Sequence, residues 1–347
     1  MAAGAIALVL GVLGGLWRLD WSVPLPGTQP ATFHGALMVA AFFGTLIGLE
    51  HAAAAGRRPA YLGPACSALG GLLTAFGAPH DVSASLLLAG SAVLALMAFG
   101  HWRRDRAPHA GVALVGALCG VAGNAIWLWG SPASDAAGAW LAFLVLTVVG
   151  ERLELSHLRR PTAGVLALLG AAVALLVGGA LALPWQWHWG AVAVGGGLVS
   201  TAVWLLATDV ARLNLGHRRQ VRYTAAALVS GYLWLGVGGL ALPFAAAGGP
   251  LYDAGLHAVF LGFIFAAAMG HAPEVLPGLL DVEVPYSPLF YAHLALLEAS
   301  LLVRVAGDLL GQPAWRAWGA LGNAAALALF VLVTADGIRR ARSRESA

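Results

Sequence analysis

The chain has 347 residues, of which 60% are hydrophobic and only 10% charged, and its mean hydropathy is +0.81. Soluble domains carry about 25% charged residues, so this composition excludes a water-soluble globular protein and predicts a chain solvated by lipid. The net charge of +3 could suggest nucleic-acid binding, but all basic residues are arginines in short clusters between apolar runs, which argues against one basic face.

About twelve apolar runs of near-spanning length follow one another with short connections. A span in lipid must satisfy its own backbone hydrogen bonds, so each run is predicted to be an α-helix. The first run lacks a basic segment before it, and we interpret it as a true helix rather than a signal peptide. The sequence therefore predicts an all-α, polytopic membrane bundle that forms one transmembrane domain over residues 1–347. The predicted spans are Ala2–Trp17, Phe33–Ala54, Tyr61–Ala78, Val82–His101, Ala110–Trp129, Ala136–His157, Ala163–Leu183, Trp189–Thr208, Tyr223–Ala247, Leu251–Gly270, Leu289–Gly307 and Trp315–Thr334.

The arginines predict the orientation of the chain, because cytoplasmic connections are enriched in basic residues. They gather after the second, fourth, sixth and eighth predicted spans and in the C-terminal tail, which predicts that both termini are cytoplasmic; only the connection Pro273–Ser287 after the tenth span dissents, since it carries acidic residues, which count little in this rule. We expect the chain to lie in a bacterial inner membrane. The clustered arginines are Arg57, Arg58, Arg103, Arg104, Arg106, Arg159, Arg160, Arg212, Arg218, Arg219, Arg222, Arg339, Arg340, Arg342 and Arg344.

Two histidines lie within predicted spans near the outer membrane face. His34 is on the second span and His257 on the tenth, and both spans run from outside to inside. Two neutral imidazoles at one depth are what axial ligation of a b-type haem requires. The alternative is that each histidine only forms a hydrogen bond between helices. For the matched pair we favour haem.

Three arginines, Arg18, Arg304 and Arg316, are predicted near the outer side, where a chain of this orientation should avoid them, and two of them are candidates for a role. Arg18 ends the first predicted helix and Arg304 lies near the end of the eleventh. A guanidinium binds a carboxylate with two parallel hydrogen bonds, so both are candidate partners for haem propionates. The alternative for each is an extended side chain that reaches the membrane surface.

Three further histidines, His51, His271 and His293, are predicted toward the cytoplasmic side together with several glutamates. Three imidazoles could bind copper or a second haem. We prefer the alternative, a structural ion network that seals the helix ends.

The first two predicted helices resemble those of haem-copper oxidase subunit I. The resemblance lies in Gly15-Leu16-Trp17-Arg18-Leu19 and in Phe33-His34-Gly35-Ala36-Leu37-Met38, and the stretch His257 to Phe265 is similar to the tenth helix of that superfamily. It implies a twelve-helix fold in which His34 and His257 ligate a low-spin haem. The oxidase tenth helix carries a further histidine, which binds the high-spin haem, at the position of Gly255, and the seventh predicted span has no histidine. We therefore expect no oxygen-reducing binuclear centre.

The nearer resemblance is to the NnrS-like branch, twelve-span membrane proteins that contain haem and copper and are associated with nitric oxide metabolism. It implies haem b, allows copper, and suggests an oxidoreductase or electron-transfer protein that works with quinol, nitric oxide or a redox partner protein. Two other functions stay open at this stage: a transporter or metal permease without haem, and a non-catalytic subunit of a larger respiratory complex.

Overall fold

The structure is a computed structural model that describes residues 1–155 and 161–345, and these residues form helices joined by short connections without any β-strand. His157, Arg159 and Arg160 lie outside the described residues. The main helices are α1 (Ala2–Trp17), α3 (His34–Ala36), η1 (Leu37–Phe43), α4 (Gly44–Ala55), α5 (Leu62–Ala75), α6 (His80–Arg104), α7 (Pro108–Leu128), α8 (Ala133–Leu155), α9 (Ala163–Ala182), α10 (Trp187–Thr208), α12 (Arg219–Ala241), α13 (Pro250–His257), η5 (Ala258–Phe265), α14 (Ala266–Leu280), α15 (Phe290–Leu309) and α16 (Pro313–Glu345). Short helical turns, α2 (Gln29–Thr32), η2 (Arg58–Tyr61), α11 (Ala211–Asn214) and η4 (Leu242–Phe244), complete the order.

Ten helices among the described residues are long and apolar enough to cross a membrane. The all-helical, multi-pass class predicted from composition is therefore confirmed. Helix α1 has 16 residues and α5 has 14, so these two are shorter than the other helices that correspond to predicted spans. The count of twelve spans stays a prediction.

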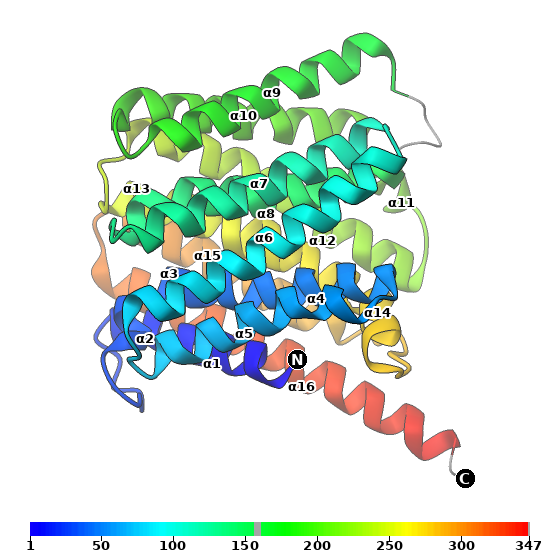
Figure 1. The fold of residues 1–347 in the computed structure, drawn as a ribbon. Coiled ribbons are helices and arrows are strands. Elements are labelled where there is room, and N and C mark those ends of the chain that lie inside the picture. Colours follow the sequence, from blue (N-terminus) through cyan, green and yellow to red (C-terminus); the bar gives the residue numbers. More distant parts are fainter. Residues whose placement is uncertain (156–160, 346–347) are drawn as a thin grey trace. The chain divides into compact units, whose positions relative to one another are not determined.

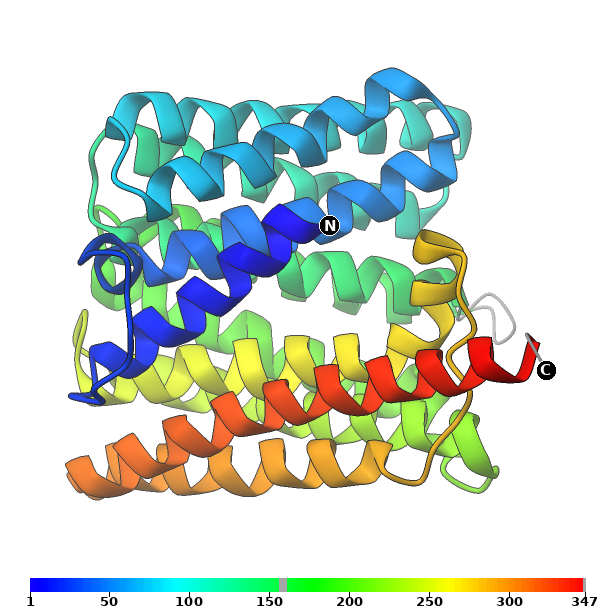
Figure 2. The same cartoon turned by 90° about the horizontal axis from the view of Figure 1, so that it is seen from below.

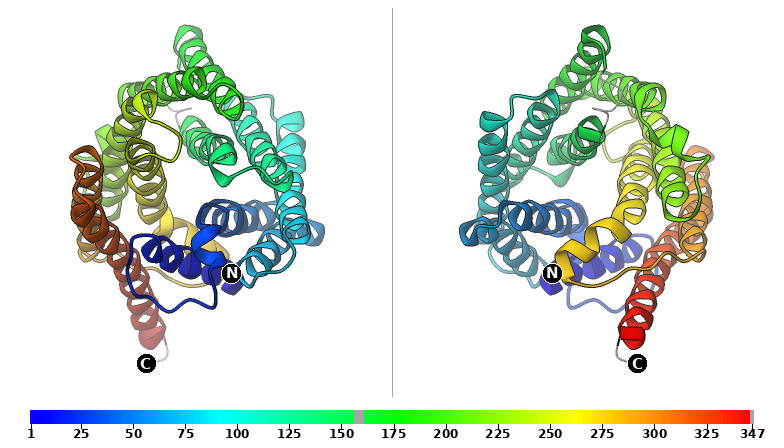
Figure 3. Two further views of the ribbon diagram at one scale, coloured as in Figure 1. Left: turned by 90° about the vertical axis from the view of Figure 1, so that its left-hand side faces the viewer. Right: turned by 90° about the vertical axis from the view of Figure 1, so that its right-hand side faces the viewer.

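The chain divides into two compact units. Unit 1 comprises residues 1–157 and 173–194, and unit 2 comprises residues 158–172 and 195–347. Within each unit the helices run nearly parallel or antiparallel, as the end-on views show (Figure 3).

In unit 1, helices α5, α6, α7 and α8 pack in sequence order, each against the next (Figure 1). A buried amide ties three of them together. The side chain of Asn124 on α7 donates to the carbonyl of Leu87 on α6 at 3.0 Å and accepts from the indole of Trp140 on α8 at 2.9 Å. Both polar ends of this buried amide are thereby satisfied, as the membrane interior demands.

In unit 2, α15 and α16 lie side by side along most of the length of α15 (Figure 2). Small residues permit the close approach, as in many membrane helix pairs. A Cβ atom at Gly319 would lie 2.5 Å from the backbone nitrogen of Arg304, so this position requires glycine. One turn on, the Asn323 amide lies 2.7 Å from the Ser300 hydroxyl.

The predicted end of the tenth span at Gly270 is wrong, because α14 continues to Leu280 through two prolines. Pro273 has no N–H for the carbonyl of residue 269, which should weaken the helix there. The Tyr223 hydroxyl of α12 donates to that Met269 carbonyl at 3.2 Å. A neighbouring helix therefore supplies the bond that proline removes, which explains how the helix extends past it.

Candidate functional site

His34 is held by the backbone of α1 in unit 1. Its Nδ1 lies 2.6 Å from the carbonyl oxygen of Gly11. A carbonyl can only accept a hydrogen bond, so Nδ1 carries the proton and Nε2 carries the lone pair. A histidine that binds a metal through Nε2 needs this tautomer, and its Nδ1–H usually bonds a carbonyl or carboxylate. A Cβ atom at Gly15 would lie 2.9 Å from the Cε1 atom of His34, so glycine there makes room for the ring.

His257 in unit 2 has the same tautomer. Its Nδ1 lies 2.8 Å from the carbonyl oxygen of Asp253, one turn earlier on α13. The Nε2 atom therefore accepts, and the Arg304 guanidinium lies 3.1 Å from it. Both histidines predicted to bind haem thus present Nε2 as the electron-pair donor, but a guanidinium already contacts that atom in His257.

A π-helical segment begins close behind each of these histidines. Residues Leu37–Phe43 form one in unit 1, and Ala258–Phe265 form the other, which directly follows His257. π-helical turns are rare and occur frequently at functional sites, because the extra residue changes the direction of the side chains around it. Nearly all residues of both segments are buried. The two units therefore repeat one arrangement, a histidine with a backbone-bonded Nδ1 followed by a wide helix.

An ion network surrounds His257. The Asp253 carboxylate pairs with Arg304 at 2.9 Å and with Arg316 at 3.2 Å, and Arg316 lies 3.1 Å from the fully buried Asp308 carboxylate. Two acidic and two basic groups thus balance one another. The sequence singled out Arg304 but neither aspartate, although Asp308 lies one turn after Arg304 on the same helix, which was a readable signal.

Arg18 and Arg304 differ in their surroundings. Arg18 is exposed just after α1, in the same unit as His34, whereas Arg304 is buried against Asp253 and His257. Gly255, which stands where the oxidase tenth helix has a histidine, is closely packed, because a Cβ atom there would lie 3.0 Å from the side chain of Leu242. The propionate role of both arginines stays a prediction.

The three histidines predicted to bind copper or a second haem have separate settings. His51 is in unit 1 and its Nδ1 lies 3.0 Å from the Ile47 carbonyl; His271 is in unit 2 and bonds the Ala267 carbonyl in the same way at 2.9 Å. His293, also in unit 2, is buried, and neither of its ring nitrogens has a hydrogen-bond partner among the described residues. The rings nearest to it are those of Tyr223, Phe290 and Phe330. Its role as a metal ligand stays a prediction.

A cavity of about 100 Å³ opens between helices of unit 1. Its wall includes His51, which the sequence predicts toward the cytoplasmic side, and the glutamates Glu151 and Glu154. His101 and His109 line it as well. These two histidines were not among the predicted site residues.

Residues 1–338 match a family described as "Domain of unknown function (DUF8744)". The chain belongs to this family. Neither the search of curated proteins nor the search of solved structures found a match. The family description names no activity.

Proposed function

We propose that this protein is an integral membrane b-type haem protein in which His34 and His257 are the axial ligands of one six-coordinate haem. The observation that supports the proposal most is the shared tautomer: in both histidines Nδ1–H is used by a backbone carbonyl, which leaves Nε2 as the donor atom for iron. The pairing of the two histidines rests on the sequence, since each is described within its own unit.

The residues around each histidine would perform different tasks. At His34, the Gly11 carbonyl orients the ring, and Gly15 keeps space beside it. At His257, the Arg304 guanidinium would have to move off Nε2 before that atom could bind iron. The hydrogen bond between Arg304 and the Asp253 carboxylate would keep the guanidinium nearby. There Arg304, together with Arg18 from unit 1, would bind propionates through charge-assisted hydrogen bonds.

A bound haem supplies one-electron redox chemistry, while the chain supplies ligands, orientation and a dry environment. We propose electron transfer as the activity, with quinol or a redox protein as donor and nitric oxide as a candidate small-molecule partner. Copper, if bound, would be an addition to this function. The resemblance to oxidase helices supports haem, and Gly255 in place of a histidine argues against oxygen reduction by a binuclear centre.

We propose a bacterial inner membrane as the location, and the arginine distribution supports an orientation with both termini in the cytoplasm. This orientation places Arg18, Arg304 and the ion network around Asp253 at the outer side. Cysteine-accessibility labelling of single variants in intact cells and in inverted vesicles tests it. Labelling of residue 217 from outside intact cells would contradict the orientation.

The proposal is tested with His34→Ala and His257→Ala, purified alongside His217→Ala, in which an exposed loop histidine is lost. Each axial variant should lose the low-spin spectrum, whereas the control should keep it. If both axial variants keep the wild-type spectrum and haem content, the assignment is wrong. A wild-type protein without haem would favour the permease function instead.

A further inference from the structure

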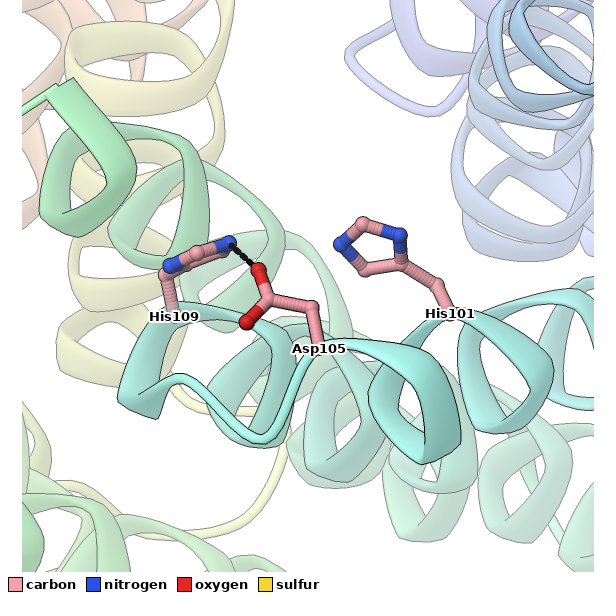
Figure 4. A group of neighbouring side chains, drawn as sticks. All are labelled: His101, Asp105 and His109. Carbon is pink, nitrogen blue, oxygen red and sulfur yellow. Dashed lines mark ion pairs between the residues drawn. The ribbon is translucent and has the colours of Figure 1, made fainter.

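Three side chains of unit 1 converge where α6 ends and α7 begins. His101 is in the last turn of α6, Asp105 follows that helix, and His109 is in the first turn of α7 (Figure 4). Each offers one ligand atom, and the three atoms lie within 4.8 Å of one another. Their spacing, His-x3-Asp-x3-His, brings them together across a tight helix–helix connection.

The connection itself holds the carboxylate in place. One oxygen of Asp105 accepts a hydrogen bond from the Ala107 backbone at 3.2 Å, and the other lies 3.4 Å from Nε2 of His109. The rings of His101 and His109 have centroids 6.1 Å apart. Metal–ligand bonds to nitrogen and oxygen are about 2.0–2.2 Å long, so small side-chain rotations would bring all three atoms onto one ion.

The neighbouring arginines do not fill this space with positive charge. Each uses its guanidinium in a contact with its own helix or connection rather than with Asp105. Arg103 lies over the ring of Phe99, Arg106 lies over the ring of Trp102, and Arg104 donates to the Gly100 carbonyl. None of these three arginines therefore pairs with the Asp105 carboxylate.

The cavity of unit 1 is a second, independent observation. His101 and His109 both line it, and its wall also carries a third imidazole, His51, and two carboxylates, Glu151 and Glu154. Because His101 and Asp105 are exposed, an ion can reach the three ligands from water. The cavity therefore places further nitrogen and oxygen donors next to the three side chains.

We propose that His101, Asp105 and His109 bind a divalent transition-metal ion, with Zn²⁺ as the best match. Two imidazoles and one carboxylate are donors that suit zinc, and the absence of a thiolate from the three argues against Cu⁺. Three protein ligands leave a coordination position for water or for a group from the cavity. This site is separate from the proposed haem ligands, and neither proposal depends on the other.

Isothermal titration calorimetry with ZnCl₂ tests the site on full-length protein in detergent, purified without a histidine tag and stripped with a chelator. The wild type should bind one equivalent, and His101→Ala and His109→Ala should each weaken binding by more than about tenfold. Asp105→Asn should weaken it too. His217→Ala, which removes another exposed histidine, should bind as the wild type does.

A second readout separates ligand loss from misfolding. Co²⁺ in place of Zn²⁺ should give a ligand-field absorption spectrum in the wild type and in His217→Ala, and this spectrum should vanish in the double variant His101→Ala/His109→Ala. Gel filtration should show the double variant as monodisperse, because His101 is exposed and His109 only half-buried. Zn²⁺ binding that survives in the double variant, or that is absent from the wild type, overturns the proposal.

Discussion

The two units hold a similar histidine by the same kind of backbone bond but in different surroundings. In unit 1, His34 is fixed by a neutral carbonyl and by the space that Gly15 leaves. In unit 2, His257 bonds the backbone carbonyl of Asp253 and also lies beside a charged network formed by Asp253, Arg304 and Arg316. The comparison shows that a backbone carbonyl is enough to fix the tautomer of a histidine. The charges around the ring can then differ between the two histidines while the tautomer stays the same.

The largest effect is expected at the network. Asp253→Asn keeps the side-chain shape but leaves two guanidiniums without their shared carboxylate. Breaking a buried ion pair on one side costs about 3–5 kcal/mol, so the free energy of unfolding in detergent should fall by that amount. Because His257 bonds the backbone of residue 253, its tautomer should persist.

The matched control is Asp81→Asn, an exposed carboxylate in the first turn of α6. It should change the free energy of unfolding by less than about 1 kcal/mol. Denaturant titration of both variants measures the difference. Equal stability of Asp253→Asn and the wild type would show that the network does not support unit 2.

The next effect is expected at the backbone-held histidine. Gly15→Ala places a methyl group 2.9 Å from the His34 ring, which must move and strain its bond to Gly11. Overpacking of this kind costs about 1–3 kcal/mol. We expect lower thermal stability and weaker haem retention. Gly178→Ala, where an added Cβ meets nothing within 4 Å, should be neutral or slightly stabilising; if both variants behave alike, His34 is not confined by α1.

The smallest effect on stability is expected at Arg18, because its side chain is exposed, whereas that of Arg304 is buried. Arg18→Gln should leave the free energy of unfolding within about 0.5 kcal/mol of the wild type. If Arg18 binds a propionate, the same variant should still lose haem faster during chromatography, and Arg18→Lys should restore retention only in part. Unchanged retention in Arg18→Gln would limit the propionate role to Arg304.

Much of the helical architecture could be predicted because lipid demands long apolar runs. The span Phe33–Ala54 agrees closely with the helical stretch from His34 to Ala55, and Ala163–Leu183 agrees with α9. The extension of α14 past Gly270 was not predicted, since the Tyr223 hydroxyl that bonds the Met269 carbonyl comes from another helix. The two π-helical segments could not be predicted either, because their apolar residues are equally typical of an ordinary membrane-spanning α-helix.

The candidate sites were predictable only in part. Ionisable residues within apolar runs stand out, so His34, His257 and Arg304 were found from the sequence. Their partners were not, because a backbone carbonyl such as that of Gly11 leaves no trace in residue type. The cluster of His101, Asp105 and His109 has a regular His-x3-Asp-x3-His spacing that is readable in the sequence, but no prediction was made from it.

The central claim is that this chain holds haem, and the most direct test is a reduced-minus-oxidised spectrum of the purified wild type with pyridine haemochrome quantification. The account predicts one b-type haem per chain with a low-spin spectrum that carbon monoxide does not change, because both axial positions are occupied by histidine. A purified, monodisperse protein without haem, or a haem that binds carbon monoxide as a five-coordinate centre does, would contradict it.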